Sequence, residues 1–145
     1  MAYSHVAHDC IISNNVILSN GVQLGGHVEV DDFAVIGGMT PVHQFSRIGC
    51  YSFIGGGLRV VQDIPPYILA NGEPIKYSGI NVIGLRRHNF HQNIKSGIKE
   101  VYNIIYHSNL NVSQALEKIR KTAILTKEIK NIVDFIKNSK RGIIC

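Results

Sequence analysis

The stretch that decides the fold runs from Val6 to Ile64: VAHDCIISNNVILSNGVQLGGHVEVDDFAVIGGMTPVHQFSRIGCYSFIGGGLRVVQDI. One position in every six of this stretch is aliphatic, with no slip of phase: Val6, Ile12, Leu18, Leu24, Val30, Ile36, Val42, Ile48, Ile54 and Val60. The position four residues after each of these is also small or apolar. Short repeats with a fixed aliphatic position indicate a solenoid, and a six-residue repeat predicts a parallel β-helix.

Glycine and asparagine gather between the aliphatic positions, for example at Asn15 and Gly26. Both residue types tolerate a left-handed backbone, so we expect them to form the corners between very short strands. Pro65-Pro66 predicts the end of the solenoid, because proline lacks the N–H that a strand ladder needs. The sequence thus predicts a β-solenoid over residues 1–66 and a connection over residues 67–80.

After Asn81 the sequence period changes from six to that of an amphipathic helix. Apolar residues recur at helical spacing in three segments: Ile94, Ile98, Val101 and Ile105; Val112, Ala115, Leu116, Ile119 and Ala123; Ile129, Ile132, Val133 and Ile136. Ser113 is a candidate N-cap for the second segment, and the third ends near Gly142. Residues 81–145 are therefore predicted to form a basic α-helical domain.

Length and composition are those of one packed domain, since 45% of the 145 residues are hydrophobic. No apolar run reaches the length of a membrane span, and the N-terminus lacks the charged start and apolar core of a signal peptide. The three cysteines lack the spacing of a metal site, and one would be left over from any pairing. A reducing, cytoplasmic location fits these features.

Charge is unevenly distributed along the chain. Residues 1–64 carry two basic and five acidic side chains, a net charge of −3, whereas residues 65–145 carry 13 basic and five acidic ones, a net charge of +8. Such a basic module predicts an acidic partner, which could be a nucleic acid, a phosphate-bearing ligand or an acidic protein. No aromatic and basic platform supports nucleic acid. A lysine-rich, solvated helix surface is the alternative that composition leaves open.

The repeat begins at Val6 without an atypical capping repeat, although the terminal repeats of a solenoid normally carry one. We therefore expect that the natural chain extends further toward its N-terminus, so that this sequence begins in the middle of a solenoid. Another subunit that covers the open end is the alternative.

Four segments carry a more specific likeness. They are His5–Cys10 (HVAHDC), Gly25–Val28 (GGHV), Gly37–Phe45 (GGMTPVHQF) and Gln62–Tyr67 (QDIPPY). In this order, and followed by a basic helical tail, they closely resemble the acyl-carrier-protein–UDP-N-acetylglucosamine O-acyltransferases of lipid A biosynthesis. The likeness covers essentially the whole chain, which is similar to the C-terminal half or more of these enzymes.

The resemblance implies a left-handed parallel β-helix with three hexads in each coil, assembled as a homotrimer. It implies transfer of an (R)-3-hydroxyacyl chain from acyl carrier protein to the 3-hydroxyl of UDP-N-acetylglucosamine, in clefts between neighbouring subunits. The acyl chain arrives on the phosphopantetheine of acyl carrier protein, so we expect no further cofactor and no metal. The basic helices would dock the acidic carrier protein.

Three hexads in each coil place residues 18 apart in one column, about 4.8 Å from one another. Nine residues of the motifs then form three neighbouring columns: His8, Gly26 and Gln44; Asp9, His27 and Phe45; Ala7, Gly25 and His43. Three imidazoles thus converge on one ridge, with His5 at its rim. Core packing does not explain such a gathering of histidines.

Acyl transfer to a hydroxyl needs a base for the hydroxyl proton and hydrogen-bond donors for the oxyanion. His8 matches the catalytic base of the family, and a neutral imidazole suits that task near neutral pH. Asp9 is the candidate that orients His8, provided that a corner conformation brings the two together, because neighbours on a strand point to opposite sides. Gly26 matches the glycine whose backbone N–H serves as the oxyanion donor.

Seven further residues match substrate contacts of the family: His5, His27, His43, Gln44, Gly56, Asn81 and Arg87. The first four match positions that line the substrate cleft. Gly56 matches a glycine along the acyl groove, but Phe53 lies nearby, so the sequence does not decide the acyl length. Asn81 and Arg87 match nucleotide contacts, and the fork of the Arg87 guanidinium suits phosphate oxygens.

Three alternatives stay open. A zinc enzyme similar to γ-class carbonic anhydrases would use three histidines across a subunit interface, but their spacing differs here and Asp9 and Gly26 would have no role. A related hexapeptide acyltransferase, such as the N-acyltransferase later in the same pathway, is disfavoured by the Gly37–Phe45 motif. The third is a catalytically silent, truncated trimer that still binds the carrier protein.

Overall fold

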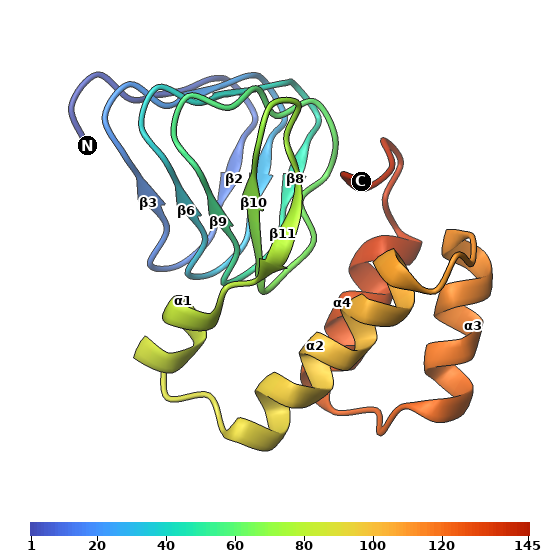
Figure 1. Cartoon of the computed structure of the whole chain (residues 1–145). Coiled ribbons are helices and arrows are strands. Elements are labelled where there is room, and N and C mark those ends of the chain that lie inside the picture. The colour runs from blue at the N-terminus through green and yellow to red at the C-terminus, as the bar shows by residue number, and fades with distance from the viewer.

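The computed structural model describes all 145 residues, and it shows a β-solenoid with a group of helices packed beneath it (Figure 1). Nine two-residue strands form the coils: β1 (His5–Val6), β2 (Ile11–Ile12), β3 (Ile17–Leu18), β4 (Gln23–Leu24), β5 (Glu29–Val30), β6 (Val35–Ile36), β7 (Pro41–Val42), β8 (Arg47–Ile48) and β9 (Phe53–Ile54). Every third strand joins the same sheet, so that β1-β4-β7, β2-β5-β8 and β3-β6-β9 form the three sides of a prism.

Residues 18 apart pair in parallel on all three sides. His5 pairs with Gln23, and Ile11 pairs with Glu29. The register confirms the expected coil of three hexads. It also confirms the columns of residues that the sequence predicts, because every column follows from this spacing.

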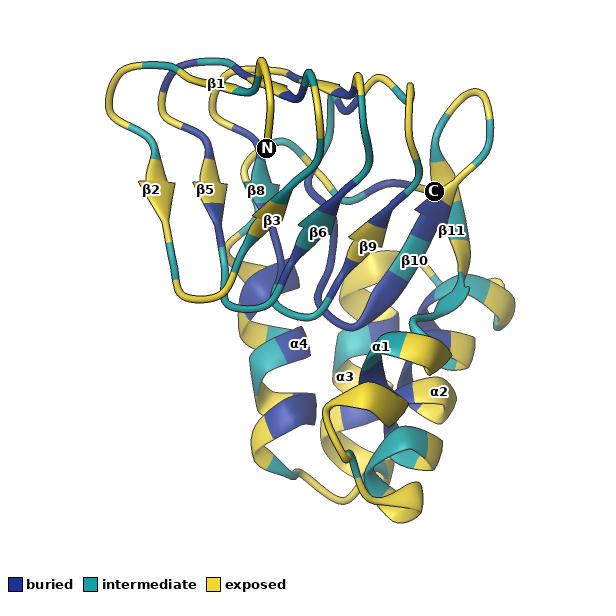
Figure 2. Cartoon of the chain, turned by 90° about the vertical axis from the view of Figure 1, so that its left-hand side faces the viewer, coloured by how far each residue is buried: buried dark blue, intermediate teal, exposed yellow.

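The repeating aliphatic residues point into the prism. Leu24 is 1% exposed, whereas Val6, one coil earlier in the same column, is 44% exposed. Figure 2 shows this burial increasing from β2 and β3 toward the later coils. Each fully buried aliphatic side chain contributes roughly 1.5–3 kcal/mol relative to an exposed one. The stacked columns are therefore the main source of stability in the solenoid.

The corners have a regular backbone that the sequence predicts only in part. One residue in every six has a positive φ: Tyr3, Asp9, Asn15, Gly21, His27, Phe33, Met39, Phe45, Tyr51 and Gly57. Most of these are neither glycine nor asparagine, so the expectation that those two types supply the left-handed positions is wrong for most corners. Stacked aromatic rings, such as Phe33 and Tyr51 with ring centres 4.9 Å apart, help to offset a cost of roughly 1–2 kcal/mol for each left-handed residue.

The solenoid continues past Pro65-Pro66, contrary to the sequence prediction. Strand β10 (Ile68–Asn71) pairs in parallel with β9, Leu69 lying beside Phe53, and β11 (Lys76–Ile80) folds back on β10 as an antiparallel edge. The prolines lie at a corner, where Pro66 stacks over Gly49 and no ladder N–H is needed. Residues 67–80 therefore contain two strands of the prism as well as a turn.

Four helices follow: α1 (Val82–Arg87), α2 (Gln92–His107), α3 (Val112–Thr122) and α4 (Lys127–Lys137). Asn111 caps α3, so the prediction of Ser113 as its N-cap is wrong. The Asn111 side chain accepts a hydrogen bond from the Gln114 N–H at 2.9 Å, and the Gln114 side chain accepts one from the Asn111 N–H. This reciprocal capping box starts the helix two residues earlier than Ser113 would.

Specific contacts hold the helices against the prism. The Arg47 guanidinium lies 4.3 Å from the centre of the Phe135 ring of α4, and the Tyr102 hydroxyl of α2 donates to the Pro66 carbonyl at 2.6 Å. The Asn131 amide of α4 donates to the Cys50 sulfur and to the Tyr67 hydroxyl. None of the helices is long and apolar enough to cross a membrane.

Candidate active site

The first group of candidate residues lies at the corner that joins β1 to β2, β4 to β5 and β7 to β8. We call this corner the histidine ridge, and three coils contribute to it: residues 7–10, 25–28 and 43–46. The His27 N–H donates to the His8 carbonyl, and the Phe45 N–H donates to the Gly26 carbonyl, both at 3.0 Å. The side chains of the ridge therefore project from a hydrogen-bonded frame.

His8 and Asp9 form a pair on the first coil of the ridge. Asp9 has a φ of 58°, and this left-handed turn brings its Oδ2 to 2.9 Å from Nδ1 of His8. The corner conformation that the sequence analysis required is thus present. When Nδ1 carries the proton and donates to Asp9, Nε2 keeps a free lone pair. The hydrogen bond from His8 and the nearby charge of His27 lower the pKa of Asp9, so that Asp9 stays ionised at neutral pH.

His27 lies one coil below Asp9 and joins the same cluster. Its Nε2 is 3.7 Å from Oδ2 of Asp9, and its ring packs edge-to-face against the His8 ring with centres 5.2 Å apart. The Phe45 ring, another coil below, stacks on the His27 ring, with centres 4.7 Å apart and nearly parallel planes. Phe45 therefore fixes the plane of the His27 imidazole, a role that the sequence analysis did not assign.

Gly26 lies directly beneath the His8 ring. A Cβ at this position would lie 2.6 Å from Cε1 of His8, so only glycine leaves room for the imidazole in its present position. The Gly26 N–H is not among the donors of the turn hydrogen bonds. An imidazole lone pair and a free N–H thus lie on adjacent layers. This is the pair of groups needed to remove a proton and to stabilise a developing oxyanion.

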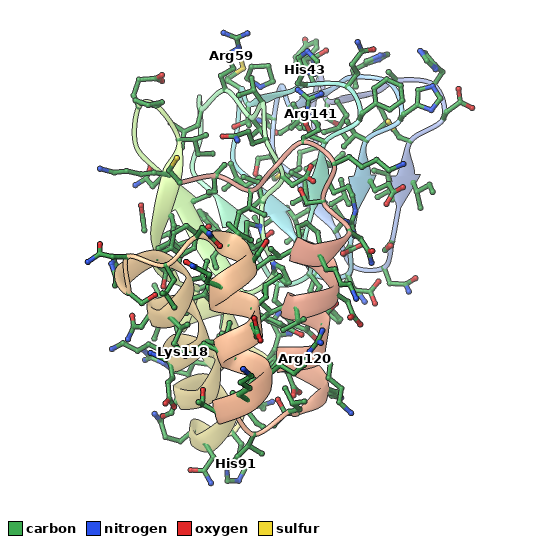
Figure 3. The ribbon with its side chains drawn as sticks, turned by 90° about the vertical axis from the view of Figure 1, so that its right-hand side faces the viewer. His43, Arg59, His91, Lys118, Arg120 and Arg141 are labelled. Atoms are coloured by element: carbon green, nitrogen blue, oxygen red, sulfur yellow. The ribbon has the colours of Figure 1, made fainter.

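Three other predicted residues lie near the ridge without joining the cluster. His43 is exposed and its Nδ1 lies 3.0 Å from the Gln44 carbonyl, but no ring contact links it to His8 or His27. Figure 3 shows His43 and Arg59 on the side of the prism that lies far from the helices. Gln44 is exposed on the third coil, and His5 is exposed on the outside of β1. All three side chains are accessible to a ligand bound along the ridge.

Two of the remaining predicted residues, Asn81 and Arg87, line a second feature, a pocket of about 560 Å³ outside the sheet of β3, β6 and β9. Its wall is largely apolar and includes Ile17, Val35, Phe53 and Leu69. Residues 17, 35 and 53 are 18 apart and form an outward-facing column. Sequence reasoning could have found this column, because an outward strand position is normally polar.

Asn81 and Arg87 line the same pocket, beside α1. The Asn81 side chain accepts from the Gly84 N–H at 3.1 Å and donates to the Tyr51 carbonyl at 2.9 Å, so both of its polar atoms already have protein partners. Arg87 is exposed at the end of α1 and forms no ion pair. His88, which the sequence analysis did not select, also lines the pocket and packs edge-on against the Phe33 and Tyr51 rings.

The two groups lie on opposite parts of the prism. The histidine ridge is the corner between the first two sides, whereas the pocket lies on the third side, which is opposite that corner. Gly56 lies in the turn after β9, at the edge of the third side. A single chain therefore does not bring Asn81 or Arg87 next to His8.

Comparison with known sequences identifies one family. The family described as UDP-N-acetylglucosamine O-acyltransferase, domain 2, matches residues 63–144. A protein of Burkholderia lata named acyl-[acyl-carrier-protein]–UDP-N-acetylglucosamine O-acyltransferase is 45% identical over 99% of this chain, which covers 56% of that protein. The chain thus spans about half the length of the curated relatives it matches.

Solved structures agree with this comparison. A UDP-N-acetylglucosamine acyltransferase from Bacteroides fragilis superposes with a TM-score of 0.97 at 50% identity, over 98% of this chain and 56% of that one. The enzyme from Francisella novicida superposes with a TM-score of 0.95 at 39% identity, over 99% of this chain and 53% of that one. The Arabidopsis enzyme superposes with a TM-score of 0.88 at 33% identity, over 98% of this chain and 53% of that one. The expected left-handed parallel β-helix followed by helices is confirmed by this likeness.

Proposed function

Because this chain belongs to the UDP-N-acetylglucosamine O-acyltransferase family, we propose that it moves an (R)-3-hydroxyacyl chain from acyl carrier protein to the 3-hydroxyl of UDP-N-acetylglucosamine. This is the first step of lipid A biosynthesis. The observation that carries the proposal is the stacking of His8, oriented by Asp9, over the free N–H of Gly26.

The chemistry follows from these three groups. Nε2 of His8 takes the proton of the sugar 3-hydroxyl while the oxygen attacks the thioester carbonyl. The Gly26 N–H donates to the oxyanion of the tetrahedral intermediate. Asp9 stabilises the imidazolium that has formed. The C–S bond then breaks, the phosphopantetheine sulfur takes the proton from His8, and the products are the O-acylated sugar nucleotide and the free thiol of the carrier protein.

The other predicted residues receive roles in substrate binding. His5, His27, His43 and Gln44 offer exposed polar groups along the ridge for the sugar, the phosphates or the hydroxyl of the acyl chain. The apolar wall of the pocket suits the acyl chain. Gly56, in the turn after β9, has no side chain that would block an acyl chain passing that turn. Arg87 offers a free guanidinium for a phosphate, and Asn81 holds α1 in place beside it. No cofactor other than the phosphopantetheine of the donor is proposed.

A homotrimer is the second part of the proposal. The histidine ridge and the pocket are on opposite parts of one chain, but rotation about a threefold axis can place the ridge of one chain against the pocket of the next. The apolar column of the third side supports this arrangement, because Ile17 and Phe53 remain 49% and 39% exposed in the single chain. Each active site would then contain residues of two chains.

Acyl carrier protein is the proposed macromolecular partner. The net charge of +8 over residues 65–145 favours an acidic protein, and Figure 3 shows Lys118 and Arg120 on the outer helix α3. The cytoplasm is the proposed location, because the three cysteines are free and the reaction uses a carrier-bound thioester.

Product formation from UDP-N-acetylglucosamine and (R)-3-hydroxyacyl carrier protein tests the proposal. The chain is assayed beside a version extended at its N-terminus with the preceding coils of a relative. We expect the same O-acylated product from both, with slower turnover by the shorter chain. Carrier-protein binding by both versions without any product would contradict the proposal and would favour a silent binding fragment.

A further inference from the structure

Three potential metal ligands meet on the histidine ridge. One ligand atom each from His8, Asp9 and His27 lies within 4.8 Å of the other two. Oδ2 of Asp9 is 2.9 Å from Nδ1 of His8 and 3.7 Å from Nε2 of His27. In a tetrahedral zinc site with bonds near 2.0–2.1 Å, neighbouring ligand atoms are about 3.3 Å apart. Small rotations of the side chains would therefore bring all three atoms to bonding distance.

The backbone and the packing preorganise these ligands. Asp9 and His27 occupy equivalent left-handed corners of successive coils, both with a φ of 58°. The His27 N–H is hydrogen-bonded to the His8 carbonyl, so the two layers cannot slide apart without loss of that bond. Stacking on Phe45 fixes the plane of the His27 ring. The ligand side chains consequently lose little conformational freedom when an ion binds.

The chemistry of the donors selects the kind of ion. Two imidazole nitrogens and one carboxylate oxygen suit Zn²⁺, whereas Mg²⁺ and Ca²⁺ prefer oxygen ligands alone. The side chains of His8 and Asp9 are 72% and 65% exposed, so water can complete the coordination. We propose that His8, Asp9 and His27 form a binding site for Zn²⁺ or a divalent cation of similar preference. The γ-class pattern of three histidines, which the sequence analysis compared and found absent, differs from this set.

The consequence for turnover rests on the proposed function. When zinc binds Nδ1 of His8, the imidazole proton stays on Nε2, which then has no free lone pair. When zinc binds Nε2, the ion itself occupies the Nε2 lone pair. Neither form of the ring can accept a proton from a hydroxyl. Zinc bound at this site therefore inhibits acyl transfer, and a chelator restores it. Zinc at this site blocks the base and takes no part in acyl transfer.

Metal titration of the whole chain tests the binding directly, without reference to activity. Co²⁺ is added to a chain in which the exposed Cys145 is replaced by serine, and its visible absorption reports tetrahedral coordination. Zn²⁺ is then titrated against a coloured chelator. We expect one equivalent of metal per chain. The variants Asp9→Asn and His27→Asn should weaken binding more than about tenfold, since loss of an outer-shell partner alone costs 10–100-fold. Asparagine tolerates the left-handed corner, so both variants should fold.

The matched control is His107→Asn, which removes an exposed imidazole of α2 far from the ridge. It should bind metal as the parent does. Equal affinity of the parent, Asp9→Asn and His27→Asn would overturn the proposed site, as would the absence of binding in the parent.

A second measurement separates this proposal from the proposed function. Product formation is followed with Zn²⁺ and with a chelator. Zinc inhibition that the chelator reverses is expected in the parent and in His107→Asn. Full turnover at saturating zinc would contradict the inhibitory role. If no condition gives turnover, the proposed function fails, and the cobalt and zinc titrations still decide whether the metal site exists.

Discussion

At the scale of single residues, the left-handed backbone of Asp9 determines how the histidine ridge is arranged. A strand conformation would point Asp9 away from His8, whereas a φ of 58° places its carboxylate 2.9 Å from Nδ1 of His8. The same conformation at His27 and at Phe45 stacks their rings in the column below. One repeated backbone feature thus brings together His8, its carboxylate partner Asp9 and the imidazole of His27.

Gly26 offers the sharpest test at this scale. The change Gly26→Ala places a methyl group where His8 now lies, with 2.6 Å between Cβ and Cε1 of His8. We expect the exposed His8 ring to swing away, which would lower acyl transfer by about 100-fold or more. The free energy of unfolding should change by less than about 1 kcal/mol, because the His8 side chain is 72% exposed and can turn into solvent. Turnover and urea unfolding check the two expectations.

Gly97→Ala on α2 is the matched control, because its new Cβ would meet only Cδ1 of Ile129, at an ordinary 3.5 Å. It should leave turnover unchanged. Parent-like turnover by Gly26→Ala would show that the position of His8 over Gly26 is irrelevant to the reaction.

The sequence predicts which residues of the site stack in columns, but it does not predict the contacts between their side chains. The 18-residue spacing predicts that His8 lies over Gly26 and that Asp9 lies over His27, and the register confirms both columns. The contact between His8 and Asp9 depends on the sign of one φ angle, which residue type does not decide for aspartate. The stacking of Phe45 on His27 follows from the same angle, and so it was not predicted.

At the scale of the elements, the regular six-residue repeats predict the strands and their register, whereas a coil of irregular length is not predicted. Inward aliphatic positions repeat without a gap, so the strands and their register follow from the sequence. The last coil departs from this spacing: Leu69 pairs with Phe53, 16 residues earlier, and Pro65-Pro66 occupies a corner. Proline interrupts a sheet where its missing N–H would have donated to a neighbouring strand. At a corner no such N–H is needed, so the two prolines did not end the sheet as the sequence predicted.

The junction of α4 with the prism leads to a pH prediction. Burial raises the pKa of the Cys50 thiol from 9.0 to about 11, with Asn131 of α4 donating to its sulfur. The thiol therefore ionises more readily in the unfolded chain than in the folded one. Stability should be unaffected by this group below pH 9 and should decrease between pH 9 and pH 11. Urea unfolding at several pH values measures the decrease.

Cys50→Ala removes the ionising group and serves as the reference for that measurement. It should show a smaller alkaline loss of stability than the parent. Superimposable pH profiles of the parent and Cys50→Ala would mean that the thiol is not protected by burial at this junction.

At the scale of the whole molecule, the proposed homotrimer predicts that each active site combines residues of two chains. His8 belongs to the ridge and Arg87 to the pocket on the opposite side. His8→Ala and Arg87→Glu should each be almost inactive alone. Mixed trimers contain some sites with an intact ridge from one chain and an intact pocket from the next. Unfolding and refolding the two variants together in equal amounts should therefore recover about a quarter of the parent turnover.

Two ridge variants provide the control for the mixing experiment. His8→Ala refolded with His27→Asn should give no more turnover than the average of the two variants measured separately, because no site then has an intact ridge. A shared site would be contradicted if His8→Ala and Arg87→Glu also failed to complement each other while both assembled normally.

The most direct test of the account is the acyl transfer of His8→Ala measured beside His107→Ala. If His8 is the base, its loss lowers product formation by about 10²- to 10⁴-fold, whereas the loss of a distant imidazole on α2 leaves it unchanged. Sedimentation should show the same assembly for both variants and the parent. Parent-like product formation by His8→Ala, in an intact assembly, would contradict the assignment of the histidine ridge as the catalytic site.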